Sequence, residues 1–319
     1  MPELNLSLIS QASTFLEGKI KKTPLEFSPI FSELLNVPAY LKMEFLQITG
    51  SFKLRGALFY LSTLSDQEKQ NGVAACSAGN HGLGVAYAAK LMGANCTVYA
   101  PKNLDNAKHK KILQLGANVQ CSQFVGYDDT LEWTKSEVDK KQQHLISAFD
   151  DERIMAGNGG TLAAEILNDV PDMQNLIVPV GGGGLSGGMA YYLKTKNPSI
   201  RIVGSQLKAS PALQLSLERG EAVVKLPSVD TFAGGIEGGI GKKCFEILKS
   251  RIDDVVLLSE EEIIQAFCWM LKNQQFLIEP TSSASVAACL TSRLKLKGPT
   301  VIVLSGRNVG YTTIQQLVR

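Results

Sequence analysis

The chain has few of the residues that build disulfide frameworks or metal centres. Its 319 residues include only six cysteines and three histidines. The cysteines lie far apart, mostly in apolar stretches and without a Cys-x-x-Cys pair, so we expect reduced thiols in a reducing compartment. His81, His109 and His144 are the only histidines, and their spacing assembles no zinc-type cluster. The sequence therefore predicts no metal site and a cytoplasmic location.

A strong charge imbalance and a long apolar run are absent as well. Lysine and arginine number 32 against 30 aspartates and glutamates, a net charge of +2 at pH 7. This balance gives no electrostatic reason to expect nucleic acid or an anionic membrane as partner. No apolar run reaches the roughly 18 residues of a membrane span, and the opening Met1-Pro2-Glu3 is unlike a signal peptide. We expect a small molecule as partner, with neither nucleic acid nor a membrane.

Short β-branched runs alternate with helical patterns along the chain. The predicted strands form two series, 73–77, 96–100, 119–123 and 144–149, then 176–180, 201–206, 255–258 and 300–305. Helical patterns separate most of these runs, which is typical of β-α-β units with largely parallel sheets. The predicted fold class is therefore α/β, with open, mostly parallel sheets flanked by helices.

One lysine stands where the extended run 39–45 gives way to a helical pattern. It lies in the segment Thr49-Gly50-Ser51-Phe52-Lys53-Leu54-Arg55-Gly56-Ala57. A lysine amine becomes a covalent catalyst of carbonyl chemistry when its surroundings lower its pKa and orient it. Taken alone, Lys53 fits a solvated helix position better. Three further segments favour the catalytic interpretation: 77–81, 181–188 and 305–308.

Four consecutive glycines, Gly181 to Gly184, follow a buried-strand pattern and begin a helical one. Glycines let the backbone approach an anion closely, and the first-turn N–H groups favour its charge, so we predict a phosphate site. The run also fits the dinucleotide pattern Gly-x-Gly-x-x-Gly. That alternative needs an acid at the end of the next strand, which here ends in Ser205-Gln206. A purely structural turn remains the other alternative.

The segment Ser77-Ala78-Gly79-Asn80-His81 also joins a predicted strand to a predicted helix. Small residues and free N–H groups at a helix start form an anion-binding nest. By itself the segment fits a simple turn better, with Ser77 or Asn80 as the helix cap. Beside Lys53 the anion-binding interpretation is favoured.

Together these segments resemble the serine/threonine dehydratase and serine racemase family, the fold type II enzymes that use pyridoxal 5'-phosphate. The resemblance runs from about Lys22 to the C-terminus, and the Thr-Gly-Ser-Phe-Lys-x-Arg-Gly-Ala pattern is its most specific feature. It implies a two-domain fold like that of the tryptophan synthase β chain. Residues 1–71 plus 150–319 would form a large cofactor-binding domain, and 72–149 a small α/β domain. It further implies a homodimer, and we expect no C-terminal regulatory domain.

The resemblance also implies roles for individual residues. Lys53 would hold the cofactor and remove the substrate's Cα proton, Phe52 would pack on the ring, and Ser305 would face the pyridine nitrogen. The implied cofactor-binding set is Phe52, Lys53, Asn80, Gly181, Gly182, Gly183, Gly184, Leu185, Glu279 and Ser305. The implied substrate-binding set is Ser77, Ala78, Gly79 and His81. Glu165 matches another recurring acid of the family, but we expect a carboxylate on a helix surface there.

The implied activity is dehydration and deamination of L-threonine or L-serine to 2-oxobutanoate or pyruvate and ammonia. Racemases of the family carry a serine as second acid at the position of Ala78, whose methyl group cannot donate a proton. Gln206 replaces a metal-binding glutamate, and Gly234 replaces an aspartate near the substrate. Another β-hydroxy amino acid such as 3-hydroxyaspartate, serine racemisation, and a non-catalytic amino-acid-binding role therefore remain as alternatives. The segment 157–161 carries one residue more than is usual in the family.

Overall fold

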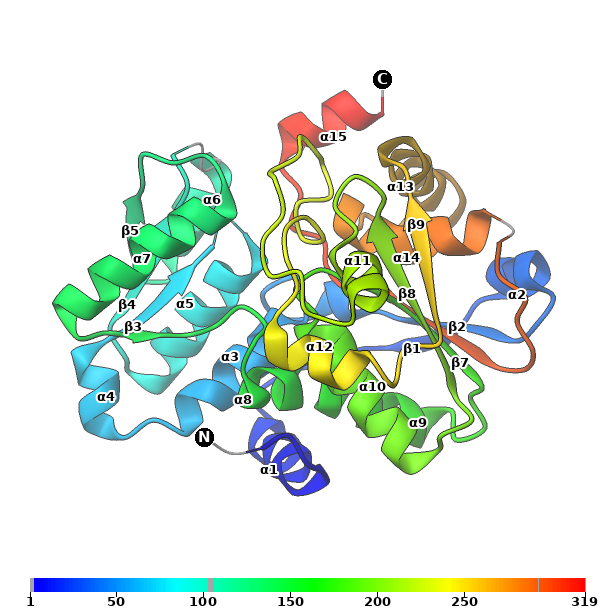
Figure 1. The fold of residues 1–319 in the computed structure, drawn as a ribbon, viewed down its shortest axis with the longest axis horizontal. Coiled ribbons are helices and arrows are strands. Elements are labelled where there is room, and N and C mark those ends of the chain that lie inside the picture. Colours follow the sequence, from blue (N-terminus) through cyan, green and yellow to red (C-terminus); the bar gives the residue numbers. More distant parts are fainter. Residues whose placement is uncertain (1–2, 78, 103–105, 292, 319) are drawn as a thin grey trace.

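The computed structural model describes residues 3–77, 79–102, 106–291 and 293–318, and they form two β-sheets with helices around them (Figure 1). The larger sheet has six strands in the order β1-β2-β10-β7-β8-β9, and the smaller has four in the order β5-β4-β3-β6. The large-sheet strands are β1 (Leu25–Phe27), β2 (Ala39–Lys42), β7 (Asn175–Pro179), β8 (Arg201–Leu207), β9 (Asp254–Leu258) and β10 (Thr300–Val303). The small-sheet strands are β3 (Val73–Cys76), β4 (Cys96–Ala100), β5 (Asn118–Cys121) and β6 (His144–Leu145).

Helices separate most of the strands. The α-helices are α1 (Leu6–Leu16), α2 (Pro29–Leu35), α3 (Lys53–Ser62), α4 (Asp66–Asn71), α5 (Asn80–Met92), α6 (Asn106–Gln114), α7 (Tyr127–Lys141), α8 (Glu152–Met155), α9 (Thr161–Asp169), α10 (Gly184–Lys196), α11 (Ala212–Arg219), α12 (Lys242–Leu248), α13 (Glu260–Gln274), α14 (Pro280–Leu290) and α15 (Tyr311–Leu317). A short 3₁₀ turn, η1 (Glu44–Leu46), and a π-helical turn, η2 (Ala156–Gly160), complete the set. Ser65 and Ser259 begin α4 and α13 with capping boxes.

Both faces of the large sheet are buried, as expected for a parallel sheet covered by helices. Side chains alternate along its central strands. Leu176 and Val178 of β7 join a core with α1, α9, α10 and α12, whereas Ile177 joins a core with α2, α13 and α14. This alternation follows from the two-residue period of a strand, and it sandwiches the sheet between two layers of helices.

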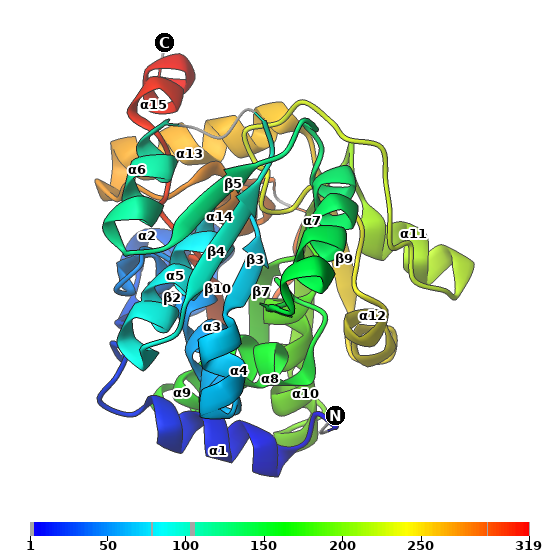
Figure 2. The same ribbon diagram turned by 90° about the vertical axis from the view of Figure 1, so that its left-hand side faces the viewer.

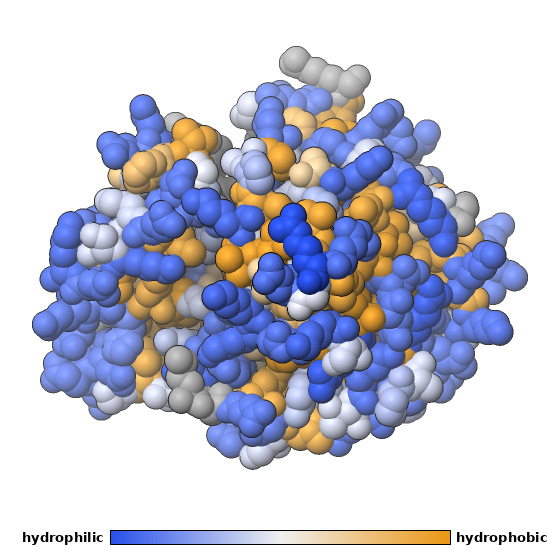
Figure 3. All heavy atoms as spheres, in the orientation of Figure 1, coloured by the Kyte–Doolittle hydropathy of each residue, from blue (hydrophilic) through white to orange (hydrophobic). Residues whose placement is uncertain are grey.

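The small sheet is covered in the same way. Val73 and Ala75 of β3 pack in a core with α3 and α5, while Ala74 packs with Tyr99, Val138 and the α7 side. Figure 2 shows these strands between α5 and α7. In Figure 3, apolar residues gather in the middle of the face, between the regions of the two sheets, and hydrophilic residues cover its margins.

The predicted fold class is confirmed, and the predicted strands are present with shifts at their ends. The largest shift is at 144–149, where β6 ends at Leu145 and the chain then turns, because the Ser147 hydroxyl accepts from the N–H groups of Phe149 and Asp150. The edge strand β1 was not predicted, and it pairs antiparallel to β2. The division into a large and a small domain stays a prediction; α3, assigned to the large domain, packs in the small sheet's core.

Within the described residues, no helix has the length and apolarity needed to cross a membrane. The same residues contain no group of three or more histidines, cysteines, aspartates and glutamates placed to hold a metal ion.

The parallel strands bring the predicted site segments to one edge of each sheet. β10 and β7 are neighbours and run in the same direction. Ser305 follows β10, Gly181 follows β7, and Ser77 follows β3 at its carboxyl end. Ligands of open α/β sheets bind outside the carboxyl ends of the strands.

Candidate active site

The amine of Lys53 lies at the start of α3 in a half-buried position. Its Nζ donates a hydrogen bond to the Ala148 carbonyl oxygen at 2.7 Å and lies 5.2 Å from the centroid of the Phe52 ring. Burial lowers the pKa of Lys53 from 10.5 to about 8, against the opposing effects of Cys244 and Glu279. A lysine of this kind has a reactive neutral amine near neutral pH.

The turn before Lys53 is fastened to the segment after β10. The Phe52 N–H donates to the Ser305 carbonyl at 3.2 Å, and the Arg307 N–H donates to the Gly50 carbonyl at 2.9 Å. An isolated antiparallel bridge joins Ser51 and Gly306. Lys53 and Ser305, 252 positions apart in the chain, are therefore held within one local backbone arrangement.

Ser305 is almost fully buried, with 2% of its surface exposed. Its hydroxyl group makes no hydrogen bond to any other residue that the structure describes. A hydroxyl without a protein partner is free to bond to a polar atom of a ligand. Ser305 can therefore serve a polar atom of a ligand placed beside Lys53.

The glycine run forms a cradle in which no side chain would fit. A Cβ at Gly181, Gly182, Gly183 or Gly184 would come within 2.2–2.8 Å of Gly235, Phe149, Cys244 and Phe149, respectively. Gly183 has φ +93°, a left-handed conformation that favours glycine, and precedes α10. Among the described residues, no acceptor takes a backbone hydrogen bond from Gly182, Gly183, Gly184 or Leu185. These N–H groups at a helix start are free to bind an anion.

Asn80 begins α5 and is held from two sides. Its Nδ2 donates to Glu279 Oε1 at 2.6 Å, and its Oδ1 accepts from Asn308 Nδ2 at 2.6 Å. Glu279 is 8% exposed, and its own N–H donates to the Gly306 carbonyl at 2.9 Å. Asn80 and Glu279 thus lie beside the Ser305 segment, as the sequence predicts for a shared site.

The other residues of the predicted anion-binding segment are arranged in different ways. The Ser77 hydroxyl accepts from the Gly79 N–H at 3.0 Å, and His81 Nε2 bonds to the Ile146 carbonyl at 2.9 Å. Because a carbonyl only accepts, Nε2 carries the proton. Burial, assisted by the charge of Lys53, lowers the pKa of His81 to about 3, so its ring is neutral. Ala78 lies outside the described residues.

α5 approaches Lys53 closely at a glycine that the sequence analysis missed. A Cβ at Gly84 would lie 3.1 Å from the Lys53 carbonyl carbon and 3.2 Å from the Leu54 nitrogen. The absence of a side chain at Gly84 therefore lets the helix that carries Asn80 pack directly against the start of α3. In the sequence alone, Gly82 and Gly84, two and four residues after Asn80, are a weak signal.

Beneath Lys53 lies a buried ionic cluster, which corrects the expectation for Glu165. Arg55 donates to Glu44 through Nε and Nη2, both at 2.8 Å, and to Glu165 through Nη1 at 2.7 Å. Lys42 Nζ donates to Glu165 at 2.8 Å. The expectation of a solvated surface carboxylate at Glu165 is wrong, because its side chain is only 21% exposed and pairs with the buried Arg55 and Lys42. Burial opposes ionisation of Glu165, but Arg55 and Lys42 lower its pKa. In the sequence, Arg55 in the motif around Lys53 was the signal that could have indicated a carboxylate partner.

The glycine-containing segment before α9 also supports α3. Asn158 Oδ1 accepts from the Gly56 N–H at 2.8 Å, and a Cβ at Gly56 would lie 2.8 Å from this side chain. Asn158 belongs to η2, a π-helical turn. One additional residue in a helix produces such a turn, which agrees with the extra residue noted at 157–161.

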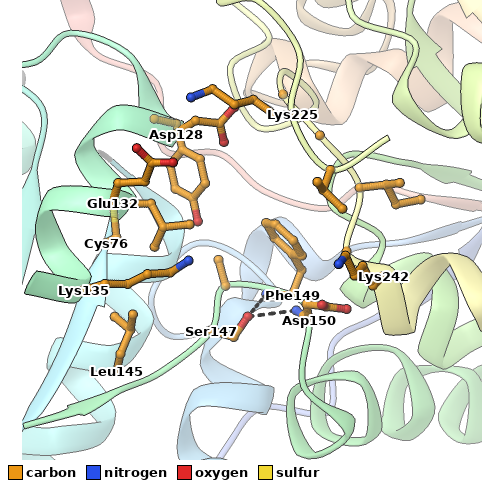
Figure 4. A pocket seen from close by; sticks show the side chains of 18 of the residues that line it. Cys76, Asp128, Glu132, Lys135, Leu145, Ser147, Phe149, Asp150, Lys225 and Lys242 are labelled. Atoms are coloured by element: carbon orange, nitrogen blue, oxygen red, sulfur yellow. Dashed lines mark hydrogen bonds between the residues drawn. The ribbon is translucent and has the colours of Figure 1, made fainter. Parts of the chain in front are cut away.

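A cavity of about 480 Å³ adjoins Lys53's partner Ala148. It lies between α7, the segment 145–150 and the segment 237–242, and its wall includes Cys76 at the end of β3. Figure 4 shows Lys135 and Lys242 approaching it from opposite sides, with Phe149 between them in this view. The predicted cofactor-binding residues do not line this cavity, which meets the Lys53 region only through Ala148.

The fold and the site define an enzyme that uses pyridoxal phosphate. The chain belongs to the family described as "Pyridoxal-phosphate dependent enzyme", whose model matches residues 16–306. The predicted family and cofactor are thereby confirmed. The residues fit this cofactor, since the site offers free backbone N–H groups for a phosphate, an amine of lowered pKa and, at Ser305, a hydroxyl that no described residue bonds.

Individual relatives are similar over nearly the whole chain. The L-threonine ammonia-lyase of Geobacter sulfurreducens is 36% identical, covering 99% of this chain and 78% of that protein. The catabolic L-threonine dehydratase TdcB of Escherichia coli K12 is 34% identical, covering 97% and 94%. Among solved structures, maize serine racemase superposes with a TM-score of 0.91 at 28% identity, covering 98% of this chain and 96% of that one.

Proposed function

We propose that this enzyme is an ammonia-lyase that dehydrates and deaminates L-threonine, and L-serine as a second substrate, to a 2-oxo acid and ammonia. The observation that carries the proposal is the half-buried Lys53 amine, whose pKa is lowered to about 8 and whose turn is bonded to Ser305. The similarity to an L-threonine ammonia-lyase over 99% of the chain supports the same reaction.

The cofactor, when bound, spreads the negative charge that develops at the substrate's Cα. We assign its binding to Phe52, Lys53, Asn80, Gly181, Gly182, Gly183, Gly184, Leu185, Glu279 and Ser305. Lys53 would hold the cofactor covalently, and once the substrate's amino group has displaced it, the freed neutral amine of Lys53 would take the Cα proton as general base. The free N–H groups after β7 bind the phosphate, and the Ser305 hydroxyl meets the ring nitrogen. A neutral hydroxyl does not keep that nitrogen charged, which suits elimination.

The substrate carboxylate is assigned to the segment of Ser77, Ala78, Gly79 and His81, chiefly through backbone N–H groups. His81 contributes shape and not acid–base chemistry, because its ring is neutral and bonded to Ile146. The absence of a hydroxyl at Ala78 makes racemisation a minor activity.

The remaining assignments extend this proposal. Residues 1–71 with 150–319 form the large domain, and residues 72–149 form the small one. The enzyme acts in the cytoplasm as a homodimer and needs no metal ion. The dimer follows from the family resemblance and the cytoplasmic location from the reduced cysteines, all six of which are free.

The test is a 2-oxo acid assay of the cofactor-loaded enzyme with L-threonine, L-serine and 3-hydroxyaspartate. We expect 2-oxobutanoate from threonine, less pyruvate from serine, and no product from Lys53→Ala. Reaction of 3-hydroxyaspartate alone would replace the substrate assignment with the second candidate, which Gly234 favours because an acidic side chain is missing there. A protein that binds the cofactor and converts none of the three would contradict the lyase proposal.

A further inference from the structure

Asn308 joins two separate parts of the proposed site through one amide group. Its Nδ2 donates to the Thr49 carbonyl at 2.8 Å and to Asn80 Oδ1 at 2.6 Å. Thr49 precedes the turn that leads to Lys53, and Asn80 begins α5. An amide NH₂ has two hydrogens to donate, so both are used between these two segments.

The turn before Lys53 is shaped to receive this side chain. Gly50 has φ +78°, and a Cβ on it would lie 2.9 Å from Asn308 Oδ1. The Asn308 amide therefore lies against the bare backbone of Gly50. The same segment is fastened further by the bond from the Arg307 N–H to the Gly50 carbonyl.

The two contacts of Asn308 determine which way the Asn80 amide points. The Asn308 atom that meets the Thr49 carbonyl must be the nitrogen, because a carbonyl only accepts. The Asn80 atom that meets this nitrogen must in turn be the oxygen. The Asn80 nitrogen then faces Glu279, at 2.6 Å from Oε1, and lies beside Gly306, which follows Ser305. A flipped Asn80 would place an oxygen against a carboxylate and a nitrogen against a donor.

We propose that Asn308 is a positioning residue that fixes the Asn80 amide with its N–H side toward the cofactor. This inference rests on the proposed function, which assigns Asn80 to cofactor binding, and it takes the Asn80 N–H as the donor to the cofactor's phenolic oxygen. Asn308 itself does not touch the cofactor. It holds together the turn of Lys53, the start of α5 and the segment of Ser305, so that the donor of Asn80 is oriented before the cofactor binds.

Asn308→Ala removes both hydrogen bonds and leaves the Asn80 amide held only by its bond to Glu279. We expect the dissociation constant of pyridoxal phosphate to rise about tenfold, the usual scale for one well-placed hydrogen bond. The pH midpoint of the visible band of the loaded enzyme should move upward, because a donor to the phenolic oxygen favours its deprotonated form. Asn308→Asp should act in the same direction, since a carboxylate cannot donate to either acceptor.

The decisive experiment is a double-mutant cycle with Asn80→Ala, read by absorbance titration of the cofactor-free protein with pyridoxal phosphate. If Asn308 acts through Asn80, Asn308→Ala should add little to the dissociation constant or the band midpoint once Asn80 is alanine. Asn71→Ala, at an exposed asparagine, is the matched control and should leave both unchanged.

Thermal unfolding of each cofactor-free variant separates positioning from general stability. The proposal would be overturned if Asn308→Ala lowered the affinity and the melting temperature equally in the wild type and in Asn80→Ala. An unchanged affinity and an unchanged band in Asn308→Ala would overturn it as well. If Asn308→Ala does not fold or loses the visible band, Asn308→Asp takes its place in the double-mutant cycle. The same comparison of dissociation constants and band midpoints then decides. A wild-type protein that binds no pyridoxal phosphate would instead refute the proposed function.

Discussion

Arg55 lies two residues after Lys53, and its guanidinium group grips the Glu44 carboxylate through Nε and Nη2, both at 2.8 Å, with neither side chain exposed. Burial would lower the pKa of Arg55, but Glu44 and Glu165 outweigh it and raise that pKa. The ion pair between Arg55 and Glu44 therefore anchors the first turn of α3, which also carries Lys53.

Removing this arginine should destabilise the protein strongly. Arg55→Met leaves Glu44 buried without its cation, and we expect a loss of about 3–5 kcal/mol in the free energy of unfolding. Denaturant unfolding of the cofactor-free protein measures it. Lys22→Ala, which breaks the exposed pair with Asp169, is the control and should cost at most about 1 kcal/mol. Equal effects of the two substitutions would contradict the structural role of the cluster.

A methyl group in the glycine cradle should disturb both packing and cofactor binding. In Gly182→Ala the new Cβ would lie 2.2 Å from a Phe149 ring carbon. We expect a destabilisation of about 1–3 kcal/mol and weaker binding of pyridoxal phosphate. Gly126→Ala is the control, because the nearest atom to its Cβ would be 3.9 Å away. Adding Phe149→Ala to Gly182→Ala should recover part of the stability; no recovery would show that the ring is not the obstacle.

The lowered pKa of Lys53 predicts how cofactor capture depends on pH. With a pKa of about 8, the neutral amine at pH 7 is roughly 300 times more abundant than on an ordinary lysine. The rate at which the cofactor-free protein captures pyridoxal phosphate should therefore rise with pH and level off above about 8. Stopped-flow absorbance measures this rate. A rate still rising steeply at pH 10 would show an ordinary lysine pKa.

The same shift predicts a pH dependence of stability. Because the pKa of Lys53 is lower in the folded than in the unfolded protein, the unfolded chain binds more protons between about pH 8 and 10.5. The free energy of unfolding of the cofactor-free protein should therefore gain from Lys53 as pH rises through this window. Denaturant titrations of wild type and Lys53→Met at several pH values measure this pH-dependent contribution of Lys53 to the free energy of unfolding. The contribution should be absent from the variant.

Position 78 predicts the balance between elimination and racemisation. The wild-type enzyme should form pyruvate from L-serine with little D-serine, and Ala78→Ser should increase the share of D-serine. Chiral chromatography of the reaction mixture measures both products. Comparable rates of D-serine and pyruvate formation by the wild type would contradict the assignment of Lys53 as the single acid–base group.

The sequence predicted the parts of this structure that depend on local pattern. β-branched runs marked β4, β7 and β8 within about a residue, and the motif around Lys53 indicated the cofactor. It did not predict contacts that depend on chain segments meeting in space. Arg55 and Glu165 are 110 positions apart, and Asn80 and Asn308 are 228 apart. No periodicity or spacing in the sequence encodes such pairs, so Glu165 was assigned to the surface and Asn308 received no role.

The central claim is that Lys53 carries the cofactor, and borohydride reduction of the loaded enzyme tests it most directly. Reduction fixes pyridoxal phosphate to the lysine that holds it, and trypsin then no longer cuts at that lysine. We expect a modified peptide from Met43 to Arg55 that contains Lys53. Modification of a different lysine, or none in a protein that shows the visible band, would contradict the account.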